Sequence, residues 1–156
     1  MVSMAQFKVM RHPAILSSIG LGSCIGLVLY DPITKIGGLA HIMLPSMQSA
    51  KDKSKPGKFA DSALRLVVKE MEGMGAHVRH LRAKVFGGAN MFSSIADDSC
   101  INIGERNLEA VREELGKKKI RIVAEEVGGK FGRTIFFDLK DGTVRVRDVK
   151  GEERIY

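Results

Sequence analysis

A cysteine closes the glycine-rich stretch GLGSC, which begins at Gly20. Glycine reaches backbone angles that other residues avoid, so a turn here can present the Cys24 side chain. The same turn can leave backbone N–H groups at Gly22 and Ser23 unpaired nearby. A thiol beside unpaired N–H groups is what a nucleophile and an oxyanion hole require. The alternative is a buried cysteine in an ordinary turn, and the spacing alone leaves both readings open.

The candidate base is His41, which lies in the apolar stretch GGLAHIML from Gly37 to Leu44. If residues 25–30 and 36–44 form a hairpin, His41 can lie beside the turn that carries Cys24. A neighbouring imidazole lowers the pKa of a thiol from its free value of about 8.5. A histidine in so apolar a strand is also often a core residue with satisfied hydrogen bonds, so the hairpin permits the contact without establishing it.

The other candidate ligands give no metal or cofactor site. His12, His77 and His80, taken with Cys24 and Cys100, have no recognised ligand spacing. The GLGSC stretch lacks the lysine of a phosphate-binding loop, and a strand is expected after it. We therefore expect no metal and no cofactor, and we expect both cysteines to be free thiols.

Length and charge restrict the class of protein. The chain has 156 residues, which predicts one domain over residues 1–156. The net charge is +7, but aromatic residues make up only 6% and do not alternate with basic residues as a base-stacking surface requires. We expect no nucleic-acid binding. The excess of positive charge fits a solvated surface or attraction of an acidic protein partner.

No targeting or membrane segment is expected. The first residues mix Gln6, Lys8 and Arg11 among apolar ones, which differs from a signal peptide. No apolar run approaches the roughly 18 residues of a membrane-spanning helix. The sequence therefore predicts a cytoplasmic protein without membrane insertion.

The elements that must position Cys24 and His41 are mostly strands. Apolar periodicity predicts helices over 59–74 and 105–117 and strands over 6–11, 14–19, 25–30, 36–44, 81–86, 120–127, 134–139 and 143–149. Asp141-Gly142 predicts a hairpin between the last two strands. The polar stretch from Ser46 to Lys58 is expected as a loop, either plainly solvated or in contact with an acidic partner. This order is typical of an α+β domain.

Several blocks along the chain together resemble the CheD family of chemoreceptor glutamine deamidases. They come in the family's order and cover nearly the whole chain. The blocks are GLGSC at 20–24, Tyr30-Asp31-Pro32, AHIMLP at 40–45, PGKFAD at 56–61, Gly87-Gly88-Ala89 with Met91-Phe92, Ile103-Gly104 with Arg106-Asn107, and Gly128-Gly129 with Gly132-Arg133.

The resemblance implies a fold and a catalytic set. The implied fold is layered, sandwich-like β-sheets with flanking helices, like cysteine hydrolases and related to bacterial toxin deamidases. The implied nucleophile is Cys24 and the implied base is His41. The family's third catalytic position, usually threonine, carries Ser18 here. Serine keeps the hydroxyl that can orient an imidazole and loses the methyl group that restrains χ1.

The resemblance also implies substrates and partners. The implied reaction converts glutamines on the cytoplasmic helices of methyl-accepting chemoreceptors to glutamates, and the same nucleophile would hydrolyse receptor methyl esters. The family also implies association with CheC, a phosphatase of the chemotaxis response regulator. The alternative function is a binding module that regulates CheC, with catalysis secondary or absent.

Overall fold

The computed structural model describes residues 1–48, 50–90 and 102–156. The order of elements is β1 (Phe7–Arg11), β2 (Ile15–Leu21), β3 (Ile25–Asp31), β4 (Ile36–Ile42), η1 (Pro56–Lys58), α1 (Ala60–Gly73), η2 (Val78–His80), β5 (Arg82–Gly87), α2 (Ile103–Lys117), β6 (Arg121–Val127), β7 (Arg133–Asp138), β8 (Val144–Asp148) and β9 (Glu153–Ile155). Every helix and strand expected from the sequence is present, with each end within two residues of its expected place. The short strand β9 was not expected.

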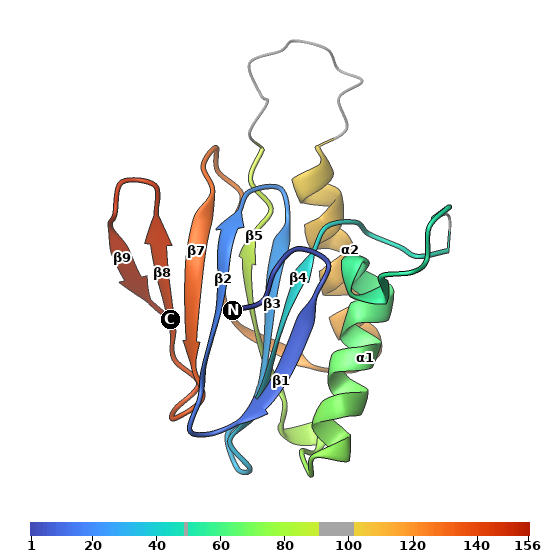
Figure 1. Cartoon of the computed structure of the whole chain (residues 1–156), viewed down its shortest axis with the longest axis vertical. Coiled ribbons are helices and arrows are strands. Elements are labelled where there is room, and N and C mark those ends of the chain that lie inside the picture. The colour runs from blue at the N-terminus through green and yellow to red at the C-terminus, as the bar shows by residue number, and fades with distance from the viewer. Residues whose placement is uncertain (49, 91–101) are drawn as a thin grey trace.

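The strands form two sheets that lie face to face (Figure 1). The first sheet has the order β1-β4-β3-β5-β6 and the second β2-β7-β8-β9. Helices α1 and α2 cover the face of the first sheet that is turned away from the second (Figure 1). The expected α+β class with layered sheets and flanking helices is confirmed.

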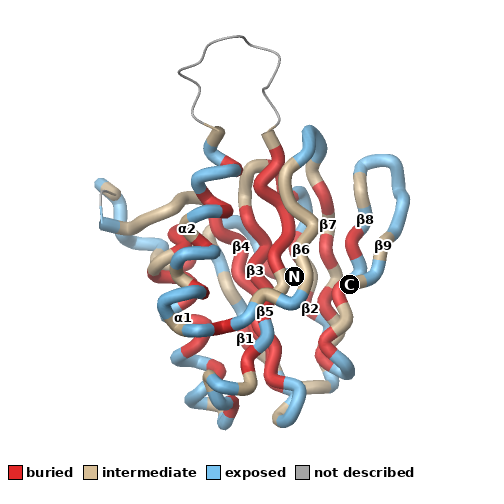
Figure 2. Tube along the Cα trace, turned by 180° about the vertical axis from the view of Figure 1, so that it is seen from behind, coloured by how far each residue is buried: buried red, intermediate tan, exposed pale blue. Residues whose placement is uncertain are grey.

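Strands β3 and β4 occupy the middle layer, and each is buried along its whole length (Figure 2). Their sequences are near-continuous apolar runs because both faces are covered. Leu27 and Leu29 pack under the helices, whereas Val28 and Tyr30 pack against the second sheet. Side chains alternate along a strand, so neighbouring residues of β3 and β4 face opposite layers, the helices on one side and the second sheet on the other.

The alternation of side chains along β4 directs His41 toward the second sheet. Its β4 neighbours Ala40 and Ile42 belong to the core under the helices, and Leu39 belongs to the core between the sheets. On β2, Leu16 and Leu21 face inward, and Ser18 is fully buried. The two sheets therefore bring the inward-facing side chains of β2 and β4 together.

The helices are amphipathic and cover the sheet with one face each. The buried positions of α1 recur at spacings of three and four, as in Ala60, Ala63, Leu64 and Val67. Asn102 caps α2, because its side chain accepts a hydrogen bond from the Glu105 N–H at 3.1 Å. Among the described residues, neither helix is long and apolar enough to cross a membrane.

Asp31, from the Tyr-Asp-Pro block, has a structural role. Its fully buried carboxylate accepts hydrogen bonds from the Ile33 N–H at 2.9 Å and the His77 N–H at 3.1 Å. We expect Asp31→Asn to lower the free energy of unfolding by about 1–3 kcal/mol, because the amide places a donor against a buried donor. Urea denaturation measures this, with exposed Asp52→Asn as the control. Equal midpoints for both variants would contradict this role.

Candidate active site

Ser18 and His41 meet between the two sheets. The Ser18 Oγ lies 2.8 Å from the His41 Nδ1 and donates a hydrogen bond to the Val2 carbonyl oxygen at 3.0 Å. A serine hydroxyl has one proton, and here that proton goes to Val2. The His41 Nδ1 must therefore be the donor in its contact with Ser18. Neutral His41 then carries its proton on Nδ1 and a free lone pair on Nε2, the form that a general base needs.

The His41 ring is buried, with an exposed fraction of 1%. Its Nε2 has no hydrogen-bond partner among the described residues. Burial lowers the pKa of His41 below its ordinary value, because a buried imidazolium loses hydration. The ring is thus held neutral at neutral pH, with its one free acceptor available for a proton.

Cys24 lies on the same side of the first sheet as His41. In the expected hairpin of β3 and β4, Gly26 pairs directly with His41. Cys24 is two residues before Gly26, and its side chain packs against the core between the sheets. Cys24 therefore lies just outside β3, on the face of the first sheet to which His41 also points. The structure joins Ser18 and His41 by a hydrogen bond and places Cys24 on the same side of the sheet.

The expected lowering of the Cys24 pKa is not what burial produces at this site. Cys24 is only partly exposed, and burial raises the pKa of its thiol above the ordinary value. With His41 neutral and Cys24 protonated, the resting pair is a thiol beside an imidazole. A base must therefore remove the thiol proton as the sulfur reacts.

In the turn before Cys24 the carbonyl oxygens accept hydrogen bonds, and two of the N–H groups have no acceptor within the described ranges. The Gly22 oxygen accepts from the Ala89 N–H at 2.8 Å, and the Cys24 oxygen accepts from the Gly88 N–H at 2.9 Å. The Gly22 N–H donates to the Gly20 oxygen at 3.0 Å, so the expectation of an unpaired N–H at Gly22 is wrong. Neither the Ser23 N–H nor the Cys24 N–H has an acceptor within the described ranges. Two free donors beside a thiol can hold an oxyanion.

Comparison with known proteins identifies the family. A family model described as CheD chemotactic sensory transduction matches residues 43–148. A protein of Caldanaerobacter subterraneus subsp. tengcongensis is 49% identical over 148 residues, which covers 95% of this chain and 91% of that protein. A protein of Pyrococcus abyssi is 45% identical over 154 residues, covering 99% and 94%. Both are named probable chemoreceptor glutamine deamidase CheD. The chain belongs to the CheD family.

The glycine block of the CheD resemblance lies directly against the Cys24 turn. A side chain at Gly87 would come within 2.1 Å of the Cys24 oxygen, and one at Gly104 within 2.6 Å of the Gly88 backbone. Gly87 has a φ of 104° and Gly88 a φ of 66°, values that favour glycine. Glycine at these positions therefore lets β5 approach the Cys24 backbone closely and lets the start of α2 approach the Gly88 backbone.

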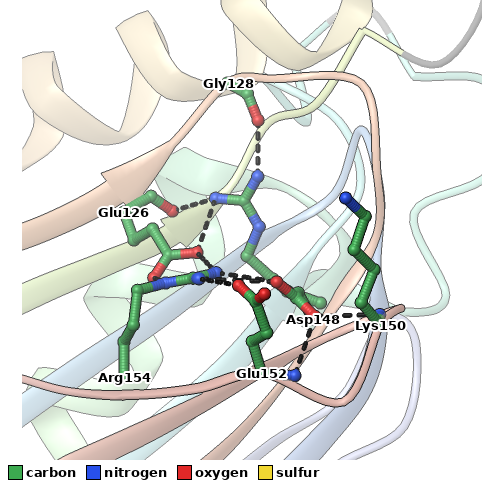
Figure 3. Close-up of polar contacts among 7 residues, drawn as sticks. Glu126, Gly128, Asp148, Lys150, Glu152 and Arg154 are labelled. Atoms are coloured by element: carbon green, nitrogen blue, oxygen red, sulfur yellow. Dashed lines mark hydrogen bonds and ion pairs between the residues drawn. The ribbon is translucent and has the colours of Figure 1, made fainter.

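The late glycine-arginine motif of the CheD resemblance, which includes Arg133, is linked to the glycine block at Gly87. Arg133 is 8% exposed, and its guanidinium donates to the carbonyl oxygens of Glu126 and Gly128. Figure 3 shows the Glu126 and Gly128 oxygens that accept hydrogen bonds, together with the ion pair between Glu126 and Arg154. The Gly128 N–H in turn donates to the Gly87 oxygen at 2.9 Å. Two contacts thus link the Arg133 guanidinium to Gly87, which lies against the Cys24 backbone.

Some sequence predictions fall elsewhere. Met91, Phe92 and Cys100 lie outside the described residues. His77 is exposed, and the His80 Nδ1 lies 3.7 Å from the Asp31 carboxylate. Within residues 1–48, 50–90 and 102–156, no three His, Cys, Asp or Glu side chains are grouped as metal ligands would be.

Sequence reasoning missed two contributors to this site. Val2 supplies the carbonyl that fixes the Ser18 proton, and no local pattern marks it. Asn107 stands in a block quoted for its resemblance, but its contacts with the turn come only from the structure. Its side-chain amide donates to the Ser23 oxygen at 3.1 Å.

Proposed function

We propose that this chain is a cysteine-dependent amidase that converts glutamine side chains of bacterial chemoreceptors to glutamate. The observation that carries the proposal is the Ser18–His41 contact, in which the Ser18 proton goes to the Val2 oxygen. That arrangement leaves the His41 Nε2 as a proton acceptor on the face of the sheet where Cys24 lies. The substrate class comes from the relatives named chemoreceptor glutamine deamidase.

Acylation begins when the His41 Nε2 takes the thiol proton and the Cys24 sulfur attacks the carboxamide carbon. A C–S bond forms, and the carbonyl π electrons move to oxygen. The Ser23 and Cys24 N–H groups stabilise that oxyanion. When the intermediate collapses, the C–N bond breaks and the nitrogen takes the proton from His41, so ammonia leaves and a thioester remains.

Hydrolysis uses the same groups in reverse. Water gives a proton to the His41 Nε2 as its oxygen attacks the thioester carbon, and the C–S bond breaks. The sulfur recovers the proton and the product is glutamate. No redox partner or metal takes part in these steps. A methyl ester of glutamate would react by the same route, with methanol as the leaving group, and we propose ester hydrolysis as a second activity.

The substrate is a side chain on a receptor helix, so the nucleophile must be reachable from a protein surface. Partial exposure of Cys24 supports this. The polar loop between β4 and α1 presents the exposed side chains of Lys51, Lys53 and Lys55. We propose that these charges attract the acidic surface of the receptor. A cytoplasmic location, a single domain over residues 1–156 and kinship with cysteine hydrolases and toxin deamidases belong to the same proposal.

The test is a direct assay on a receptor. The purified protein is incubated with the cytoplasmic fragment of a chemoreceptor, and peptides are followed by mass spectrometry. Conversion of glutamine to glutamate adds about one mass unit at specific positions, by the amidase chemistry described. The absence of any conversion across several receptors would overturn the proposed function. Association with CheC stays a prediction from the resemblance.

Ser18 is expected to act through its hydroxyl. Ser18→Ala removes the group that holds the His41 Nδ1 proton, so His41 loses its preferred tautomer and orientation. We expect kcat to fall by about 10- to 100-fold with little change in KM. Ser18→Thr retains the hydroxyl and is expected to keep kcat within about threefold of wild type. Steady-state kinetics measure both, and equal losses in the two variants would contradict the role of the hydroxyl.

A further inference from the structure

We propose that Asn107 is a positioning residue that fixes the Ser23–Cys24 peptide against the strand carrying His41. The inference rests on the proposed function, because it assigns to Asn107 the alignment of that same nucleophile and base. Asn107 lies in the second turn of α2 and is fully buried. It contributes no atom that reacts with substrate.

The Asn107 side-chain amide joins two segments that are far apart in sequence. Its Nδ2 donates to the Ser23 oxygen at 3.1 Å and to the Met43 oxygen at 2.9 Å. Ser23 precedes the nucleophile, and Met43 comes two residues after the base. One amide group therefore uses both of its protons to hold the end of the base strand and the nucleophile turn at a set separation.

The bonds stand where the strand pairing stops. The last pair of the β3–β4 ladder is Ile25 with Ile42. Beyond it, Cys24 and Met43 have no ladder bond to hold them together. The Asn107 amide joins the two segments at this position, one residue beyond the last pair of the ladder.

The Ser23 bond also directs a free donor. The Ser23 carbonyl and the Cys24 N–H belong to one planar trans peptide, so they point in opposite directions. Because the carbonyl is directed at Asn107, the Cys24 N–H is turned away from α2 and stays without an acceptor within the described ranges. Asn107 thereby fixes the aim of one of the two proposed oxyanion donors.

The carbonyl oxygen of the Asn107 side chain indicates that the two Nδ2 hydrogen bonds determine how the amide is oriented. The Asn107 Oδ1 is buried and has no hydrogen-bond partner among the described residues. A flipped amide would set that oxygen against two carbonyl oxygens, which is worse than an unpaired acceptor. The close approach of Gly104 to the Gly88 backbone brings α2 near enough for the amide to reach.

The test compares Asn107→Ala with Val111→Ala in the full chain. Val111 lies one turn further along α2, is buried in the core under the helices and has no polar side-chain group that could bond to the turn. For Asn107→Ala we expect kcat for receptor deamidation to fall about 10- to 100-fold with KM within about threefold, since a misaimed oxyanion donor acts on the transition state. Val111→Ala is expected to lose stability but keep kcat. Asn107→Ser retains one hydroxyl donor, and its kcat is expected to lie between those of Asn107→Ala and Val111→Ala. It replaces Asn107→Ala in the comparison if the alanine variant does not fold.

A second readout does not need a receptor. The rate of Cys24 alkylation by iodoacetamide is measured by peptide mapping at pH 7 and at high pH. The ratio of the two rates reports how far His41 deprotonates the thiol at pH 7, and it cancels any difference in how accessible Cys24 is to the reagent. Asn107→Ala is expected to lower this ratio toward that of His41→Ala. A wild-type kcat in Asn107→Ala, or equal losses of kcat in the Asn107 and Val111 variants, would overturn the inference. If the wild type deamidates no receptor, the proposed function has failed, and the alkylation ratio alone decides the role of Asn107.

Discussion

Cys24→Ala is expected to lower kcat for receptor deamidation by about 10⁴-fold or more, the largest effect of any single change in this chain. In the proposed mechanism the Cys24 sulfur forms the thioester, and an alanine leaves only the oxyanion donors and substrate binding. The measurement is glutamate formation under single-turnover conditions. Circular dichroism and the unfolding midpoint establish that the variant is folded.

The second cysteine provides the matched control. Cys100→Ala removes a thiol that no block of the CheD resemblance includes, and we expect it to keep wild-type kcat. An active Cys24→Ala variant would contradict the assignment of the nucleophile. So would a Cys100→Ala variant that loses activity while Cys24→Ala retains it.

His41→Ala is expected to lower kcat/KM at pH 7 by about 10²- to 10⁴-fold, the range that a general base contributes. Because burial raises the pKa of Cys24, little thiolate exists at pH 7 without a base. As pH rises and the thiol ionises by itself, the variant's rate should climb toward that of the wild type. His77→Ala, which removes an exposed imidazole, is the control and is expected to leave the rate unchanged.

The fall in wild-type activity at low pH also tests the assignment of His41 as the base. In the proposed mechanism neutral His41 is the active form, and burial lowers its pKa below the ordinary 6.5. Activity should therefore persist as pH falls through 6.5 and decline only at lower pH, where the ring becomes protonated. A decline at or above 6.5, or a His41→Ala variant whose rate does not rise with pH, would contradict the role of His41 as base.

The middle of the fold is predictable because its strands are buried on both faces. The apolar runs of β3 and β4 and the threefold and fourfold spacing in α1 each record one environment, so pattern and structure agree. Strand β9 escapes such reasoning. It has three residues and an exposed glutamate, and it pairs with β8 through contacts such as Arg147 Nε to the Glu153 Oε1 at 2.8 Å. An edge strand of this kind has no apolar alternation to detect.

The candidate site also has residues that the sequence predicts and residues that only the structure reveals. Cys24 and His41 carry recognisable chemistry, and the hairpin predicted between their strands brings them to one face. The assignment of Ser18 rested on resemblance, and the structure then places its hydroxyl at the His41 Nδ1. Val2 and Asn107 act through contacts with segments 16 and 84 positions away in sequence. Tertiary packing creates those contacts, and no local pattern encodes them.

The covalent intermediate is the most direct test of the central claim, that Cys24 attacks a receptor glutamine. The wild-type protein is mixed with a receptor fragment, quenched in acid within one turnover and analysed by intact-mass spectrometry. We predict an adduct whose mass is the sum of the two chains minus one ammonia, joined at Cys24 and decaying as glutamate appears. Glutamate formation without this adduct, or an adduct joined at another residue, would contradict the account.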